Sequence, residues 1–205
     1  MIFCVVLGLM AGAVVTLYVM NERARWLALL EFELHPPPVP FATLEVIQGA
    51  ERQYYASKST PRRLAEQVQD VVVFASPTLA NRLSFSVGRY RMKADTISHL
   101  VPWAIKKGFL TLDGTDPHTF SKAMAYFSEQ PVLNDWQAAV YLEWLRLDHP
   151  MLKDLTWEAI ANDLFLVAKL YSGYMGAGGD WEGWRADTMP GPVALRRLGL
   201  GPVAD

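Results

Sequence analysis

Residues 40–56 read PFATLEVIQGAERQYYA, and their apolar residues recur at the spacing of an α-helix. At about 100° per residue, one stripe of this helix carries Leu44, Ile47, Glu51 and Tyr54. The opposite side, where a solvated face belongs, carries Glu45, Gln48 and Arg52. Glu51 therefore points with the apolar residues, toward the core or a cleft of the folded domain.

The position of Glu51 has a chemical consequence. Loss of water around a carboxyl group disfavours its charged form, and a carboxylic acid that keeps its proton near neutral pH is what a general acid requires. Two interpretations stay open. Glu51 is either the acid of a catalytic site or a structural residue at the domain edge, neutralised by an arginine such as Arg62 or Arg63.

Downstream of this segment the sequence predicts further helices. Thr60-Pro61 is a typical start for a helix over 61–75, although 71–74 (VVVF) also suits a short buried strand. Helices are also expected over 94–107, from 116 to about 129, over 135–147 with Asn134 as N-cap, over 157–171 with Thr156 as N-cap, and near the C-terminus. The fold class is therefore mainly α, an α or α+β domain with minimal strand.

Upstream, residues 2–20 (IFCVVLGLMAGAVVTLYVM) carry no charge and match one membrane-spanning helix, at about 1.5 Å of rise per residue. A cleavable signal peptide is the alternative, although the charged residues that normally open one are absent. We expect an anchor and juxtamembrane helix over 1–34, with the helix continuing through 21–34. A Pro-rich linker over 35–40 and a helical domain over 41–205 follow.

Composition argues against several classes of function. The formal net charge is −2 and no basic stripe is present to neutralise phosphates, so no nucleic-acid partner is expected. Cys4 is the only cysteine, which excludes a disulfide within the chain and a cysteine-based metal site. The four histidines are far apart in sequence, with no pair at the helical i,i+4 ligand spacing. We therefore expect no metal and no cofactor.

Four other acidic residues are weaker candidates for a general acid. Glu66 and Asp70 share a polar side of their helix, which indicates solvent exposure and, for Asp70, a surface ion pair with an arginine of the same helix. Glu143 is expected opposite much of the apolar stripe of its helix, and Asp163 between apolar positions.

Two glycine-bearing segments have the composition of a ligand-binding wall. Residues 84–93 (SFSVGRYRMK) form a predicted loop that runs into a helix. Gly88 permits a close approach of backbone to ligand there, and Tyr90 can stack on a sugar. Residues 170–181 (LYSGYMGAGGDW) end a predicted helix in a glycine-rich loop flanked by aromatic residues. Ordinary loops with turn glycines are the alternative for both segments.

Together with Glu51, these segments resemble lytic transglycosylases and goose-type lysozymes, members of the lysozyme-like superfamily. That family has a catalytic Glu at a helix end, then a Ser/Gly-Leu-Met-Gln loop leading into a helix, and later an Ala-Tyr-Asn-Ala-Gly segment. Residues 86–96 are similar to the second motif, with Arg91 at the glutamine position. Residues 170–173 (LYSG) are similar to the third, with Ser172 at the asparagine position.

The resemblance implies a lysozyme-like domain, over roughly residues 40–185, that cleaves the glycan strand of peptidoglycan. Glu51 then protonates the glycosidic oxygen. The substrate-binding residues implied are Ser86, Gly88, Tyr90, Arg91, Tyr171 and Ser172. One carboxylate suffices for a transglycosylase, in which a hydroxyl of the sugar displaces the leaving group, and no convincing second acid is present.

This activity requires an extracytoplasmic domain on a single-pass membrane protein. Arg23 and Arg25 follow the apolar segment and no Lys or Arg precedes it, so the positive-inside rule favours the cytoplasm. That rule is a bias with exceptions. Because cleavage of the cell wall takes place outside the cytoplasm, we expect the domain outside, with the cytoplasmic orientation as the alternative.

Two other functions are consistent with the sequence. Arg91 and Ser172 favour a catalytically inactive lysozyme-like domain that binds glycan or a protein. A cytoplasmic domain favours a helical subunit of a membrane complex, with Glu51 in an interhelical salt bridge and stable protein partners.

Overall fold

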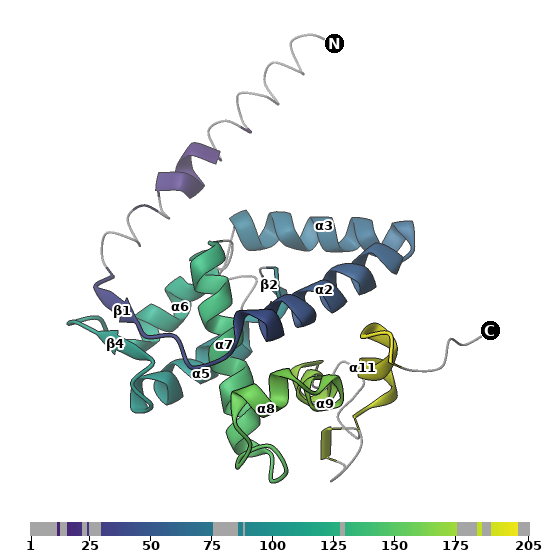
Figure 1. Cartoon of the computed structure of the whole chain (residues 1–205). Coiled ribbons are helices and arrows are strands. Elements are labelled where there is room, and N and C mark those ends of the chain that lie inside the picture. The colour runs from purple at the N-terminus through teal and green to yellow at the C-terminus, as the bar shows by residue number, and fades with distance from the viewer. Residues whose placement is uncertain are drawn as a thin grey trace.

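The computed structural model describes residues 12, 16–21, 24, 30–75, 86–87, 89–127, 130–175, 184–185 and 190–200. These residues are mainly helical, and their four short strands form two two-stranded sheets (Figure 1). The predicted mainly α class is confirmed for this part of the chain.

The predicted membrane segment, residues 2–20, lies largely outside the described residues. Of this segment the structure describes Gly12 and 16–20, all helical. Within the described ranges, no helix combines the length and the apolar character needed to cross a membrane.

Residues 32–34 form a strand, so the prediction of a helix through residue 34 is wrong there. β1 (Phe32–Leu34) pairs antiparallel with β4 (Leu110–Leu112), with Phe32 opposite Leu112. The backbone N–H of His35 extends the contact by donating to the carbonyl of Phe109 at 3.0 Å. This pairing is the physical reason for the strand, because the partner lies far downstream where local periodicity gives no sign of it.

The two helices predicted after the prolines are both present. α2 (Phe41–Ser57) places Leu44 and Ile47 in the core, and α3 (Thr60–Ala75) follows after a short turn. Residues 71–74 belong to α3, so the alternative of a buried strand is wrong.

The predicted loop before the next helix contains a small hairpin. β2 (Ser86–Val87) pairs antiparallel with β3 (Met92–Lys93), and α5 (Ala94–Lys106) follows directly. Between the strands Arg91 has a φ of 52°, in the left-handed region that non-glycine residues rarely adopt. The predicted end of α5 is confirmed by Gly108, which has a φ of 76°.

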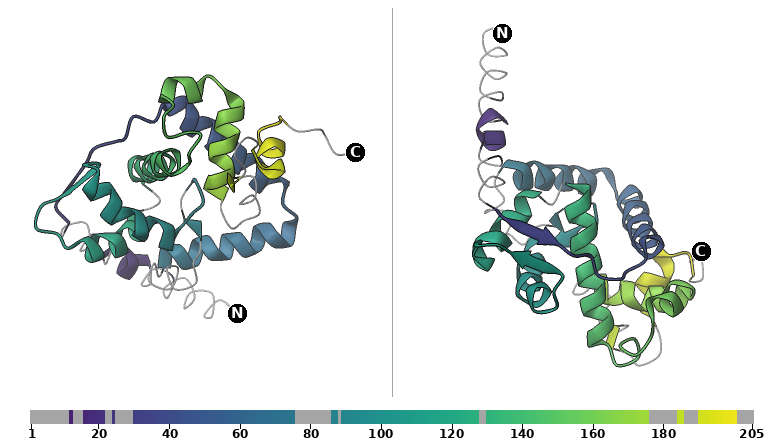
Figure 2. Two further views of the ribbon diagram at one scale, coloured as in Figure 1. Left: turned by 90° about the horizontal axis from the view of Figure 1, so that it is seen from below. Right: turned by 60° about the vertical axis from the view of Figure 1, so that its left-hand side comes forward.

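α6 (Pro117–Phe127) leads to α7 (Pro131–Asp148), which passes through the centre of the domain and is seen end-on in Figure 2 (left). Asn134 is not the N-cap of this helix, because Pro131 starts it and Gln130 occupies the N-cap position. Buried within the first turns, Asn134 instead accepts the backbone N–H of Arg89 at 2.7 Å.

Glu143 of α7 is also placed differently from its prediction. Helices surround α7 on several sides, so the face that periodicity assigns to solvent is covered by protein. Glu143 is 4% exposed and accepts hydrogen bonds from Arg146 and from the indole N–H of Trp157, each at 2.8 Å.

The helix predicted over 157–171 is divided in two. α8 (Trp157–Ala161) begins at Thr156, whose hydroxyl accepts the N–H of Ala159, so this predicted N-cap is confirmed. α9 (Leu164–Met175) is a separate helix. Asp163 precedes it, and its carboxylate accepts the N–H of Phe165 in the first turn at 2.8 Å.

α9 also runs on through Gly173, where the glycine was expected to end it. The short helix predicted near the C-terminus is α11 (Pro192–Arg197). It packs against α9 and α2, which brings Arg197 next to Glu51.

Gly173 lies where α9 meets Trp184, and replacing it with alanine is expected to destabilise the domain. A Cβ there would lie 2.6 Å from two atoms of the rigid Trp184 ring. We expect a loss of about 1–3 kcal/mol, measured by urea unfolding.

Gly49→Ala is the matched control for this substitution. A Cβ at Gly49 in α2 meets nothing within 4 Å, so alanine should stabilise the domain by about 0.5–1 kcal/mol. Equal effects of the two substitutions would show that Trp184 does not hold α9 closely.

Candidate functional site

A cleft of about 490 Å³ opens beside the C-terminal half of α2. Its walls are formed by side chains of α2, α3, the β2–β3 hairpin, α5, α7, α9 and α11. Three residues of the predicted site line it, namely Glu51, Ser86 and Arg91. Segments far apart in the sequence thus meet at one site.

Glu51 lies at the inner wall of this cleft. It is 8% exposed, which confirms the burial predicted from helical periodicity. One carboxylate oxygen accepts the Tyr171 hydroxyl at 2.5 Å and Nη1 of Arg197 at 3.0 Å. Its arginine partner is therefore Arg197 of α11, and neither Arg62 nor Arg63.

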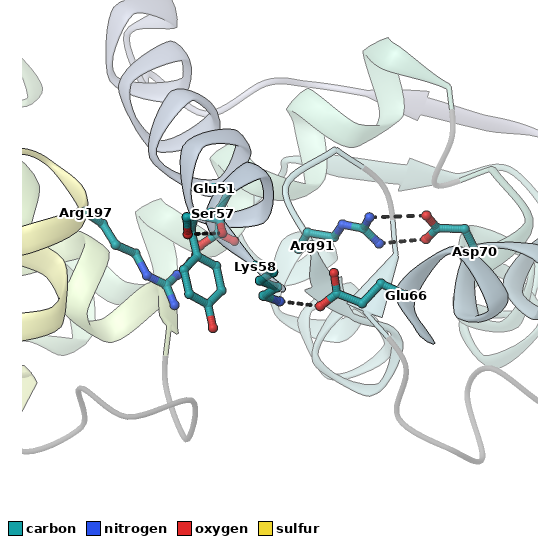
Figure 3. Close-up of polar contacts among 8 residues, drawn as sticks. Glu51, Ser57, Lys58, Glu66, Asp70, Arg91 and Arg197 are labelled. Carbon is teal, nitrogen blue, oxygen red and sulfur yellow. Dashed lines mark hydrogen bonds and ion pairs between the residues drawn. The ribbon is translucent and has the colours of Figure 1, made fainter. Parts of the chain in front are cut away.

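Arg197 is held against α2 and α9 by three contacts. Its guanidinium carbon lies 3.4 Å from the centre of the Tyr54 ring, a cation–π distance. Nη1 also donates to the Tyr171 hydroxyl at 3.1 Å, in addition to Glu51. Figure 3 shows the polar residues that form contacts around the cleft, with Arg197 and Glu51 together at one end of the group.

The other end of that group is organised by Arg91 (Figure 3). Arg91 donates to both carboxylate oxygens of Asp70, at 2.6 and 3.2 Å, and lies 3.9 Å from the Tyr55 ring centre. The hairpin is thereby tied to α3 and α2. Asp70 therefore pairs across elements, where the sequence predicted an arginine of its own helix.

Glu66 is less exposed than its helical position predicted. It is paired with Lys58, and both side chains are mostly buried. The ammonium group of Lys58 also lies 4.5 Å from the centre of the Tyr54 ring. Desolvation and then the neighbouring Glu66 raise the pKa of Tyr55, which stays a neutral phenol.

Of the remaining predicted site residues, those that the structure describes do not line the cleft. Tyr171 is fully buried and meets the site through Glu51. The hydroxyl of Ser172 donates to the Ala168 carbonyl and accepts the Gly191 N–H at 2.8 Å, so it ties α9 to the segment before α11. Gly88 lies outside the described residues.

Tyr90 is placed in the core, where its ring cannot stack on a ligand. It is 2% exposed. Its hydroxyl donates to Asp135 at 2.8 Å, and its carbonyl accepts the hydroxyl of Tyr174 at 2.6 Å. Tyr90 therefore fixes the hairpin on α7 and α9.

Sequence reasoning placed Tyr54 on the side of Glu51 but missed the rest of the aromatic lining of the cleft. Tyr54, Tyr55, Tyr141 and Tyr174 all contribute to it. Tyr141 and Tyr174 pack together with ring centres 5.4 Å apart. Tyr174 lies three residues after Tyr171, and this spacing places the two side chains on one face of α9. The sequence alone could have shown this spacing.

Burial keeps the tyrosines near Glu51 neutral. It raises the pKa of Tyr141 from 10.0 to about 12. Burial and then the charge of Glu51 raise the pKa of Tyr171 and of Tyr174. A neutral hydroxyl can donate to the carboxylate, which is the contact observed between Tyr171 and Glu51.

The domain is expected to lose stability as the pH rises from about 10 to about 12. Below this window Tyr141, Tyr171 and Tyr174 are protonated in the folded and in the unfolded chain. Within it the unfolded chain releases protons that the folded chain retains, because the pKa of Tyr141 is about 12 in the fold. Urea unfolding at a series of pH values measures this loss, and Tyr141→Phe should reduce its slope. An unfolding midpoint independent of pH in this window would contradict the expectation.

No group of three or more His, Cys, Asp or Glu side chains that could hold a metal ion is found among the described residues. Comparisons of the chain with protein-family models, curated proteins and solved structures found no match. The function is therefore argued from the site itself.

Proposed function

We propose that the chain is a membrane-anchored glycosidase of lysozyme-like fold that cleaves peptidoglycan as a lytic transglycosylase, with Glu51 as general acid and base. The main support is the position of Glu51, nearly buried, in contact with Tyr171 and at the wall of a cleft that Ser86 and Arg91 share. These residues come from the three segments that resemble that family.

Glu51 suits a reaction that needs one carboxyl group. In the first step its proton passes to the glycosidic oxygen, and the bond from that oxygen to the anomeric carbon breaks. In the second step the sugar's own C6 hydroxyl attacks the anomeric carbon and returns its proton to Glu51. The products are a shortened strand and an anhydro-sugar end, and no water is consumed.

The other carboxylates among the described cleft residues are engaged elsewhere. Glu66 is paired with Lys58. Asp95 is exposed and accepts the N–H of Thr96 in the first turn of its own helix. Neither is placed as a partner of Glu51, which favours the one-carboxylate reaction over the two-carboxylate scheme.

The aromatic lining supports a carbohydrate ligand. Tyrosine rings present an apolar face to a sugar ring and a hydroxyl to its polar edge. Tyr54 and Tyr55 lie on the helix that carries Glu51, and Tyr141 and Tyr174 line the same cleft. Sugar units bound among these rings would bring a glycosidic bond to the acid.

The ion pair with Arg197 sets a condition on this chemistry. The guanidinium group of Arg197 already binds Oε1 of Glu51. We expect bound glycan to displace Arg197 wherever the glycosidic oxygen has to approach that oxygen. If Arg197 stays in place, the pair is structural, which favours the second candidate function, an inactive domain that binds glycan.

The deciding experiment incubates the purified full-length chain in mild detergent with insoluble peptidoglycan and determines the mass of the products. Anhydro-sugar ends, lighter than the hydrolysis products by one water, are the expected result. Hydrolysed ends would show that the protein is a hydrolase and not a transglycosylase. Retention of the protein without release would establish the binding domain. If the protein neither releases products nor is retained on the glycan, the remaining candidate function is that of a subunit of a membrane complex.

A further inference from the structure

The surface of α3 carries an apolar stripe that no described part of the domain covers. Leu64, Val68 and Val71 are 62%, 57% and 64% exposed. Their spacings of four and three place them in one line along the helix. Large side chains exposed in a row on a long helix are unusual for a solvated surface.

The polar side of the same helix faces inward. Glu66 and Gln69 line the cleft, and Asp70 binds Arg91 of the hairpin. α3 is thus an amphipathic helix turned the opposite way from a helix that covers a core. At 100° per residue, the outward half of the helix between Thr60 and Val72 carries Thr60, Pro61, Leu64, Ala65, Gln67, Val68, Val71 and Val72. None of these residues is charged.

We propose that this outer face of α3, centred on Leu64, Val68 and Val71, lies on the surface of a lipid bilayer. A helix face without charge that is backed by a polar face is the pattern of a helix lying in a membrane interface. The inference rests on the membrane anchor of the proposed function, and the experiment below separates the two.

The short connection to the anchor favours a bilayer over another occupant. About ten residues join the predicted membrane segment, which ends at residue 20, to the described domain at Leu30, and an extended chain spans at most about 3.6 Å per residue. The domain must then stay within about 36 Å of the bilayer. Residues 16–21 lie on the side of the domain that α3 occupies in Figure 1 and in the right-hand view of Figure 2.

The arrangement assigns α3 a second task. Its inner face is a wall of the cleft, so an outer face on the bilayer would hold the cleft beside the membrane. The enzyme would then act on glycan close to the membrane surface, because more distant strands could not enter a cleft held in this orientation.

The test uses the full-length chain reconstituted in vesicles of phosphatidylethanolamine and phosphatidylglycerol. In a Cys4→Ser background, Val68→Cys carries a fluorophore sensitive to quenching by nitroxide-labelled lipid. The matched control carries the same fluorophore at Lys107→Cys, an exposed position just after α5. Flotation of the vesicles reports the anchor independently of the fluorophore.

The expected result is flotation with the vesicles, strong quenching at position 68 and little at position 107. Leu64→Glu with Val71→Glu should abolish the quenching at 68 without preventing flotation. The exposed pair Ala42→Glu and Gln53→Glu should leave it unchanged.

Two other results would overturn the inference. Flotation without quenching at position 68 would do so while keeping the anchor, and cross-linking between unlabelled Val68→Cys copies would then identify a second copy as the occupant. Failure to float would overturn the anchor and the inference together, while peptidoglycan cleavage in detergent would remain a separate result.

Discussion

Glu51→Gln is expected to lower the rate of muropeptide release by about 10²–10⁴-fold, the usual contribution of a general acid. Glutamine has almost the same shape, and its carbonyl oxygen can still accept the Tyr171 hydroxyl, but it has no proton to give. The rate of release from insoluble peptidoglycan, followed by mass, measures the effect. Because the site is kept while the chemistry is lost, the variant should still be retained on the glycan.

The matched control for this substitution is Glu45→Gln. Glu45 lies on the exposed side of the same helix, so the loss of one negative charge from α2 is reproduced without touching the cleft. Its activity should equal that of the wild type. Cleavage by Glu51→Gln at the wild-type rate would remove Glu51 from the reaction, and the contact with Arg197 would then be a structural ion pair.

The burial of Glu51 could be predicted because it depends on one helix only. A stripe of residues at spacings of three and four is a local property, and the structure confirms it. The partner of Glu51 could not be predicted in this way. Arg197 reaches Glu51 across 146 residues of chain, and its approach depends on how α11 packs against α2 and α9.

The errors have a common physical origin in contacts between distant segments. Residues 32–34 extend because they pair with 110–112, and their own composition does not require it. Glu143 was placed by the rule for a helix with one solvated face, and Asn134 by the preference for asparagine at N-caps. α7 is enclosed by its neighbours, so polar residues on it must find partners in the interior.

Apart from Glu51, the residues of the candidate site were expected from the family resemblance alone. Ser86 and Arg91 line the cleft with Glu51, whereas Tyr171 and Ser172, chosen on the same resemblance, do not line it. Tyr90 was chosen as a stacking residue because of its type, yet its ring lies in the core and its hydroxyl binds Asp135. Which aromatic side chains face a cleft is decided by packing, which composition does not encode.

The second large effect is expected at Glu143, where Glu143→Leu should destabilise the domain by about 3–5 kcal/mol. Leucine fills a similar volume but leaves Arg146 as a buried charge without a counter-ion. The Arg146 side chain is only 13% exposed, and the carbonyls of Lys153 and Leu155 still hold it in place. Trp157 also loses the acceptor of its indole N–H. The free energy of unfolding in urea measures the loss.

Two further variants show whether the cost arises from the unpaired buried charge. Glu143→Leu with Arg146→Met removes both charges and should recover most of the stability, because well-packed apolar residues can replace a buried pair. Asp70→Asn breaks the ion pair with Arg91, in which the Asp70 side chain is 50% exposed, and should cost at most about 1 kcal/mol. If the double variant were as unstable as Glu143→Leu, the loss would come from packing around α7 and not from the charge on Arg146.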